Sequence, residues 1–186
     1  MLLNIKTRQK YLKELGFYTG LIDGVAGQKT RAAYLALQEK YFTRQADRDG
    51  KYGIDTETLL INAYLVQKHT KNFKLEEFKC GCGGKYCSGY PHLLDKQLLI
   101  NLQTMRDKYG AITIKSGLRC SSHNAVVGGT SGSRHKIGKA ADIQCLKGKS
   151  MLGRKAIMDT WRELPGYRYT YGNTTGMGAS VHVDVR

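Results

Sequence analysis

Apolar residues in the first seventy positions recur every three or four residues, which is the spacing of one face of an α-helix. Leu12 and Leu15 show this spacing just before Gly16, a residue type that often ends a helix. Two longer sets continue the pattern, namely Ala33, Tyr34, Leu37, Gln38 and Tyr41, and then Leu59, Leu60, Ala63, Tyr64 and Val66. The pattern therefore predicts a bundle of three short helices joined by small-residue turns.

An internal repeat lies in the turns between these helices. Residues 23–30 read Asp-Gly-Val-Ala-Gly-Gln-Lys-Thr and residues 49–56 read Asp-Gly-Lys-Tyr-Gly-Ile-Asp-Thr, so both follow the pattern D-G-x-x-G-x-x-T. Asp-Gly favours tight turns, and the polar residues that end each copy are of the kind that cap a helix. We expect Asp23, Gly24, Gly27 and Thr30 to build the turn, and an exposed aromatic residue such as Tyr18 to contact ligand.

The pattern changes after the polar segment 68–72, which reads as a linker. A helix with a buried face is predicted from Leu93, Leu94, Leu98, Leu99, Leu102 and Met105, and another near 150–163 from Ile157 and Trp161. Residues 111–115 and 180–186 alternate between apolar and polar, as half-buried strands do. The predicted fold class is α+β, with a helical domain at 1–67 and, at 73–186, a domain with a small antiparallel sheet flanked by helices.

Composition and charge narrow the classes of protein. The hydrophobic fraction of 41% and the charged fraction of 24% are those of a globular chain. Its apolar runs are far shorter than the roughly 20 residues of a membrane span, so no membrane insertion is expected. The formal net charge of +15 lies mostly in residues 71–186 and favours a polyanionic partner, either nucleic acid, an anionic membrane surface or an acidic cell wall. A nucleic-acid reading element is not apparent, and nothing in the sequence predicts an obligate oligomer, so we expect a monomer.

The N-terminal residues MLLNIKTRQKYLKE lack the order of a secretory signal, in which a basic segment precedes an apolar core. We therefore expect the chain to start in the cytosol of the cell that makes it. A target outside the membrane would then require delivery by another component.

The C-terminal half contains the candidate chemistry. In residues 180–186 the period of two places Ser180, His182, Asp184 and Arg186 on one face and the valines in the core. Asp142 faces away from Ile143 on another predicted strand, and His135 lies in the glycine-bearing segment before it. Each residue alone is more often structural, as a hydrogen-bonded histidine or a salt-bridged aspartate. Together, two histidines and a carboxylate could form a three-ligand zinc site with an open position for catalysis.

Residues 15–34 carry a more specific pattern. They read L-G-F-Y-T-G-L-I-D-G-V-A-G-Q-K-T-R-A-A-Y, and Gln38 follows. This closely resembles the peptidoglycan-binding helical domain of bacterial and phage lytic enzymes, over about residues 5–66. The resemblance implies bacterial peptidoglycan as the partner.

Residues 133–143 match S-x-H-x-x-G-x-A-x-D-I, and residues 181–184 read V-H-V-D. This pair of motifs resembles the zinc D-Ala-D-Ala carboxypeptidase and L-alanyl-D-glutamate endopeptidase family, whose fold the Hedgehog signalling domain shares. The resemblance covers about residues 73–186 and implies a Zn²⁺ cofactor held by His135, Asp142 and His182. It also implies that Ser133, Gly138 and Ala140 shape the loop and allow close packing.

The segment Ser116-Gly-Leu-Arg119 is similar to the S-G-Y-R motif of that family, with Leu118 in place of the usual tyrosine. The resemblance implies that Arg119 holds a substrate carboxylate or the developing oxyanion. Many relatives place an acidic general base three residues before the last histidine ligand, but Ala179 occupies that position here. Asp184 is our candidate base, and an equal alternative is that it orients His182 or Arg119. His123 is a weaker candidate for an active-site polar group.

Five cysteines occur, an odd number that argues against a fully paired disulfide framework. Cys80, Cys82, Cys87 and Cys120 could form a second, structural zinc site, a disulfide after export, or simple buried thiols. Cys145 beside the predicted strand is expected in the core.

The two resemblances point to the same polymer. They imply a phage endolysin, a zinc peptidase that cuts a D-Ala-D-Ala or L-Ala-D-Glu type stem bond, although a cross-bridge bond stays open. Such an enzyme would accumulate in the host cytoplasm and reach the wall through a separate membrane pore. Two rivals remain, an inactive wall-binding or adhesion protein that keeps its zinc site, favoured by Ala179, and a basic nucleic-acid-binding protein.

Overall fold

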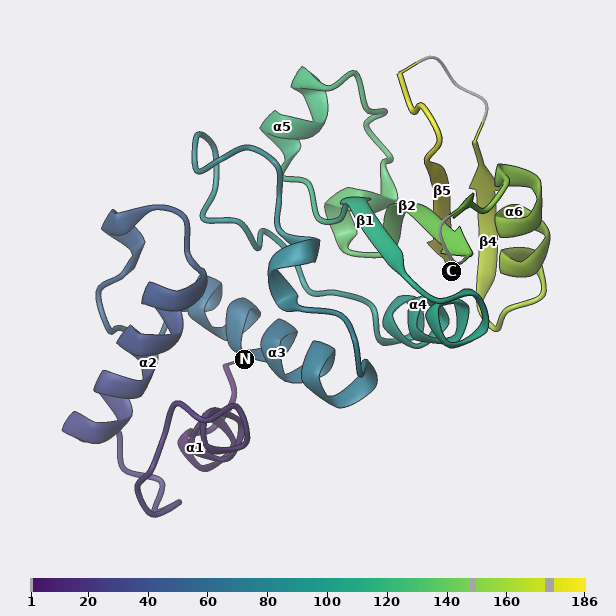
Figure 1. The fold of residues 1–186 in the computed structure, drawn as a ribbon. Coiled ribbons are helices and arrows are strands. Elements are labelled where there is room, and N and C mark those ends of the chain that lie inside the picture. Colours follow the sequence, from purple (N-terminus) through teal and green to yellow (C-terminus); the bar gives the residue numbers. More distant parts are fainter. Residues whose placement is uncertain (1, 148–149, 173–175) are drawn as a thin grey trace.

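Helices form the first part of the chain and a small sheet dominates the second, as Figure 1 shows. The computed structural model describes residues 2–147, 150–172 and 176–186. The first part contains α1 (Ile5–Glu14), α2 (Gln28–Tyr41), the 3₁₀ turn η1 (Gln45–Asp47) and α3 (Ile54–His69). The predicted three-helix module is confirmed, and α3 extends through two residues of the segment predicted as a linker.

Each copy of the repeat folds around one buried glutamine from the preceding helix. The Gln9 amide donates to Asp23 Oδ1 at 2.7 Å and accepts from the amide of Gly24 at 2.9 Å. Gln38 makes the matching bonds to the second copy, where its Nε2 donates to Thr56 Oγ1 and its Oε1 accepts from the Gly50 amide. Buried polar groups must be hydrogen-bonded, so these contacts fix both turns. The repeat residues are therefore structural, as expected.

The second part begins with the 3₁₀ turn η2 (Leu75–Phe78) and an irregular segment that leads to α4 (Lys96–Tyr109). The remaining elements are β1 (Ile112–Ser116), α5 (Ser121–Val126), η3 (Arg134–Ile137), β2 (Ala140–Lys147), β3 (Ser150–Met151), α6 (Arg154–Arg162), β4 (Tyr167–Tyr171) and β5 (Val181–Val185). The predicted α+β class, with an antiparallel sheet flanked by helices, is thus confirmed. Among the described residues, no helix is long and apolar enough to cross a membrane.

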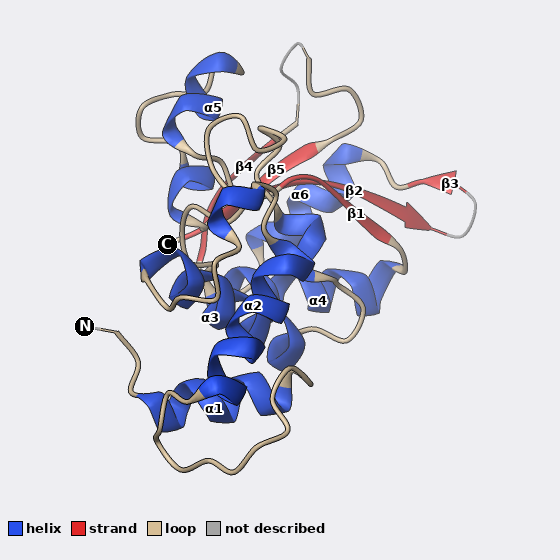
Figure 2. Cartoon of the chain, turned by 90° about the vertical axis from the view of Figure 1, so that its left-hand side faces the viewer, coloured by secondary structure: helices blue, strands red, loops and turns tan. Residues whose placement is uncertain are grey.

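The sheet is antiparallel with the strand order β1-β2-β5-β4, and β3 pairs with β2 beside this path. Helices α4 and α6 contact its strands, and in Figure 2 the strands lie at one end of the molecule and α1 at the other. Val181, Val183 and Ile143 are fully buried, as the alternating pattern predicted. Burying an aliphatic side chain contributes about 1.5–3 kcal/mol, so this face stabilises the sheet while the opposite face carries polar residues.

The two parts are held together by direct contacts and by a continuous apolar core. The Asn62 side chain on α3 donates to the His92 carbonyl and accepts from the Leu94 amide, at 2.9 and 2.7 Å. The Thr43 amide donates to the Ser88 carbonyl at 3.1 Å. The polar segment 68–72, which was predicted as a linker, gave no indication of this interface between the two parts.

Two local predictions differ from the structure, namely the start of one helix and the exposure of Tyr18. The helix predicted from Leu93 begins at Lys96, because the Asp95 carboxylate caps it by accepting from the amides of Gln97 and Leu98. Leu93 is therefore partly exposed before the helix. Cys145 is in the core, as expected.

Tyr18 is buried rather than exposed, so the prediction of an exposed aromatic side chain at this position is wrong. Its ring lies in the core, and its hydroxyl donates to the Leu21 carbonyl at 2.8 Å. The aromatic ring therefore packs in the core beside the first turn.

Candidate active site

Four polar side chains form a row across the polar face of the sheet, one from each main strand. Ser116 on β1 pairs with Asp142 on β2, Asp142 pairs with His182 on β5, and His182 pairs with Tyr171 on β4. Directly opposed residues on neighbouring strands point to the same face. The register therefore brings together residues that are far apart in the sequence, and the Tyr171 ring stacks on the His182 ring with centroids 4.7 Å apart.

His135 reaches this row from the 3₁₀ turn η3. Gly138 ends that turn in the left-handed conformation with a φ of 69°, which glycine adopts without the cost of a Cβ. The His135 ring is 2% exposed, and its Nδ1 lies 2.7 Å from the Gly117 carbonyl oxygen. Because a carbonyl only accepts, Nδ1 carries the proton and Nε2 keeps a free lone pair directed at the row.

Three ligand atoms meet at the centre of the site. His135 Nε2 lies 3.2 Å from His182 Nδ1, His182 Nδ1 lies 3.0 Å from Asp142 Oδ1, and His135 Nε2 lies 3.3 Å from Asp142 Oδ1. Tetrahedral zinc with bonds of about 2.0–2.2 Å separates its ligand atoms by roughly 3.3–3.5 Å. The nitrogen and oxygen donors are also of the type that zinc prefers. The residues present therefore fit a zinc ion, with three protein ligands and one position left open.

Asp142 is held as a carboxylate by its neighbours. Arg119 donates to Oδ2 at 2.5 Å, which leaves Oδ1 for the two histidines, and the Arg119 Nε donates to Ser116 Oγ at 2.9 Å. Burial alone would raise the pKa of the Asp142 carboxyl, but the neighbouring His135 and His182 side chains outweigh this effect and hold that pKa below its usual range. The site thus keeps one negative charge that a cation can neutralise.

Asp184 contacts the edge of the His182 ring that faces away from the ligand triangle. Its Oδ2 lies 3.3 Å from His182 Nε2, and its side chain is 2% exposed. Burial would lower the pKa of His182, whereas hydrogen bonds to Asp142 and Asp184 raise it. A carboxylate in this position fixes the tautomer in which Nδ1 is free to bind metal. The geometry therefore favours an orienting role for Asp184 over the predicted role of general base.

A cleft of about 660 Å³ opens above the row. Its described lining includes Lys115, Arg119, Gln144, Tyr171 and Ser180, and Asp142 is the one carboxylate among these lining residues. Ala179 is followed by Ser180, whose hydroxyl accepts from the Gln144 amide at 3.1 Å. The cleft is thus polar and positively charged, which suits a peptide with a free carboxylate.

His123, the weaker candidate, lies elsewhere. Its Nε2 would be 3.2 Å from a Cβ added at Gly81, so its ring faces the cysteine-bearing segment. Tyr171 was not anticipated from the sequence. Its place in the site follows only from the strand register, because β4 (Tyr167–Tyr171) shows no clear alternation of buried and exposed residues.

Comparison with known protein families decides the assignment. Residues 71–184, which are more than half of the chain, match the model of the family described as Peptidase M15. The chain belongs to the peptidase M15 family. Residues 3–60 match the model of a peptidoglycan binding domain. A comparison with curated proteins found no match. The M15 domain and its N-terminal module together make the chain a peptidoglycan peptidase in its broad class.

The four cysteines Cys80, Cys82, Cys87 and Cys120, all within the M15 match, come together as the spacing suggested. Cys80, Cys82, Cys87 and Cys120 each offer a sulfur, and the four atoms lie within 4.8 Å of one another. Each of them is a free thiol, which leaves a metal site or buried thiols. The cluster is separate from the ligand triangle, which the histidines and Asp142 form.

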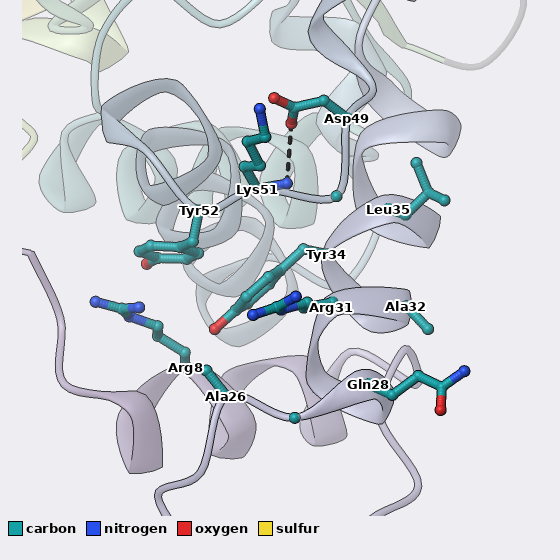
Figure 3. Close-up of a pocket in the computed structure, with 12 residues that line it drawn as sticks. Arg8, Ala26, Gln28, Arg31, Ala32, Tyr34, Leu35, Asp49, Lys51 and Tyr52 are labelled. Atoms are coloured by element: carbon teal, nitrogen blue, oxygen red, sulfur yellow. Dashed lines mark hydrogen bonds between the residues drawn. The ribbon is translucent and has the colours of Figure 1, made fainter.

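The N-terminal module contains a groove of its own, of about 910 Å³. It lies between the two repeat turns, and Figure 3 shows Arg8, Arg31, Tyr34 and Tyr52 around it. The Arg8 guanidinium lies over the Tyr52 ring, 3.9 Å from its centroid. These side chains combine aromatic surface with two positive charges. The groove is therefore a better contact candidate than Tyr18.

Proposed function

We propose that the chain is a zinc-dependent peptidase that hydrolyses a stem-peptide amide bond of bacterial peptidoglycan. The single observation that supports this most is the triangle of His135 Nε2, Asp142 Oδ1 and His182 Nδ1 beneath an open cleft. Zinc in such a site lowers the pKa of water and polarises a carbonyl group. We also propose the division into a wall-binding domain at 1–67 and a peptidase domain at 73–186.

The surrounding residues supply positioning and charge. The Gly117 carbonyl and Asp184 hold the two imidazole rings in the tautomers that leave His135 Nε2 and His182 Nδ1 free. Arg119 lines the cleft with its guanidinium against Asp142, so it is placed to donate to a carboxylate or to an oxygen that gains negative charge. Donors fixed in a partly buried site cost little reorganisation when that charge develops.

The substrate class follows from the charges of the cleft. Lys115 and Arg119 favour a peptide that carries a carboxylate beside the bond to be cut, while Gln144 and Ser180 offer hydrogen bonds to a peptide backbone. Stem peptides of the D-Ala-D-Ala or L-Ala-D-Glu type have this character. We propose a phage endolysin that accumulates in the host cytoplasm and reaches the wall through a separate membrane pore.

The groove of the N-terminal module is proposed to bind the acidic stem peptide. Arg8, Arg31 and Lys51 are its cations, and Asp49, its one acid among the described lining residues, already accepts from the Lys51 amide at 2.9 Å. The excess of positive charge suits a carboxylate-bearing ligand, and the Tyr52 ring offers an apolar face. Arg31 is exposed and extends from α2 beside the Tyr34 ring, so it is the residue best placed to test this.

Arg31→Ala should weaken binding to purified peptidoglycan by about 10–100-fold, because a hydrogen bond to a charged group contributes roughly 1.5–3 kcal/mol. Binding is measured by co-sedimentation in a His182→Ala background, which prevents cleavage of the wall. Lys10→Ala is the matched control, since Lys10 is an exposed cation of α1 outside the groove. An equal loss in both variants would show that only net charge matters and would contradict the groove.

Asp184→Asn should lower zinc affinity and activity by about 10–100-fold, as loss of a carboxylate that orients a histidine ligand typically does. The acidic limb of the pH–rate profile should persist. If Asp184 were the general base instead, zinc affinity would stay unchanged and that limb would disappear. Asp159→Asn is the control, because Asp159 is a half-exposed acid on α6 that does not line the cleft.

The proposed function is tested by release of new amino groups from purified walls, measured with and without a zinc chelator. The chelator should abolish release, and added zinc should restore it. Wall binding without any zinc-dependent release would support the inactive wall-binding protein, which the absence of a second carboxylate among the described cleft residues favours.

A further inference from the structure

The cysteine cluster joins two segments that are distant in the chain. Cys80, Cys82 and Cys87 lie in the irregular segment between η2 and α4, while Cys120 directly follows Arg119 and caps α5. We propose that these four thiolates bind a structural zinc ion that holds Arg119 in the cleft and fixes the wall-binding module against the peptidase domain. This site is separate from the proposed catalytic zinc.

The distances between the sulfur atoms suit a tetrahedral ion. The Sγ atoms of Cys82 and Cys87 lie 3.6 Å apart, and all four sulfurs lie within 4.8 Å of one another. Zinc–sulfur bonds of about 2.3 Å in a tetrahedron place the sulfurs roughly 3.8 Å apart. A disulfide requires about 2.05 Å and joins only two atoms. The four sulfurs converge on one centre, as a single ion requires.

Backbone N–H groups point at the sulfurs. The Cys120 amide donates to Cys80 Sγ and the His123 amide donates to Cys120 Sγ, both at 3.4 Å. Such bonds stabilise a thiolate, and they orient it as the outer contacts of a metal site do.

The segment 79–95 contains no helix or strand, so backbone hydrogen bonds of regular secondary structure do not stabilise its conformation. Loops of more than about 12–15 residues without secondary structure are uncommon in compact domains. Gly83, Gly84 and Gly89 take positive φ there, so the backbone turns sharply around the cluster. Tyr90 and Leu94 anchor the end of the segment in the apolar core, but residues 81–87 are exposed or half-buried, so the core does not hold the part that carries Cys82 and Cys87. A metal ion stabilises small irregular segments of this kind directly.

Segment 79–95, together with Phe78 just before it, contacts both functional regions. On one side, the Ser88 carbonyl accepts from the Thr43 amide and the Ser88 hydroxyl donates to Asp47, both residues of the wall-binding module. On the other side, the Phe78 carbonyl accepts from the Leu118 amide at 2.9 Å, one residue before Arg119. Loss of the ion would therefore loosen the module interface and the position of Arg119 together.

The test is the zinc content of the full chain, purified under reducing conditions with zinc and measured by mass spectrometry of the metal. Wild type should hold two equivalents, Cys82→Ser one, Asp142→Ala one and the double variant none. Cys145→Ala is the matched control, because Cys145 is a buried cysteine outside the cluster and its variant should keep two. With Co²⁺ in place of zinc, the sulfur-to-metal charge-transfer band should vanish in Cys82→Ser and persist in Asp142→Ala.

Two results would overturn the structural site. One is a zinc content that Cys82→Ser leaves unchanged, and the other is a thiol count in denaturant that shows paired cysteines in the native protein. Either result leaves the catalytic proposal intact, because Asp142→Ala tests that ion separately. Hydrogen exchange completes the test, since Cys82→Ser should speed exchange in segments 79–90, 118–126 and 43–47 relative to Cys145→Ala.

Discussion

His182→Ala should reduce peptidase activity by at least about 10³-fold, because removal of one ligand forfeits a metal worth several kcal/mol of transition-state stabilisation. The ring supplies Nδ1 to the ligand triangle and receives the contacts of Asp184 and Tyr171, so no neighbour can replace it. The rate of amino-group release from purified walls measures the effect. Circular dichroism should show the fold retained.

His92→Ala is the matched control for this variant, since His92 is an exposed histidine outside the ligand triangle and its bond to α3 uses the backbone carbonyl. It should keep wild-type activity. A His182→Ala chain that retained substantial activity with the same zinc dependence would contradict the assignment of the ligands.

Gly138→Ala should lower the free energy of unfolding by more than about 4 kcal/mol, a loss large enough to leave little folded protein. A Cβ at this position would lie 1.9 Å from the Leu93 carbonyl oxygen, and that oxygen belongs to the backbone. The positive φ of 69° adds roughly 1–2 kcal/mol for any residue with a Cβ. Denaturant unfolding of the purified variant measures the change.

Gly128→Ala separates the two causes. Gly128 has nearly the same φ, 70°, but nothing lies within 4 Å of an added Cβ. Its variant should lose only the roughly 1–2 kcal/mol that belongs to the backbone conformation. Equal losses in the two variants would show that the close approach of Leu93 is unimportant. The turn that presents His135 depends on this approach, because the Asp95 amide also donates to the Gly138 carbonyl at 2.9 Å.

Local patterns were sufficient to predict α1 to α4, α6 and the strands β1, β2 and β5, but they did not predict α5, β3 or β4. Alternation in residues 180–186 placed His182 on the opposite face from the valines, and the same reasoning separated Asp142 from Ile143. These inferences work because side-chain direction follows from the period of a strand. The family motifs then joined the two segments with His135, although no spacing rule brings η3 to the sheet.

Other features depend on contacts between distant segments, and the sequence could not predict them. The role of Asp184 depends on which ring nitrogen of His182 faces the ligand triangle. The alternation of a strand gives the face on which a side chain lies, but not the orientation of its ring. The contribution of Tyr171 follows from the register of β4 and β5, which includes an irregularity between Tyr167 and Tyr169. Tyr18 is buried where its hydroxyl meets the side chain of the buried Gln9 at the first turn. The interface between the N-terminal module and the second domain depends on Asn62 on α3, which donates to the His92 carbonyl.

The most direct measurement of the central claim is mass spectrometry of purified peptidoglycan digested with the zinc-loaded full chain. Stem peptides should be cut at one amide bond, each product pair gaining one water and one new amino terminus, and His182→Ala or a chelator should remove these products. The mass of the fragments then identifies the bond. Products cut only in the glycan strands, or stem cleavage that persists in His182→Ala with chelator, would contradict the account.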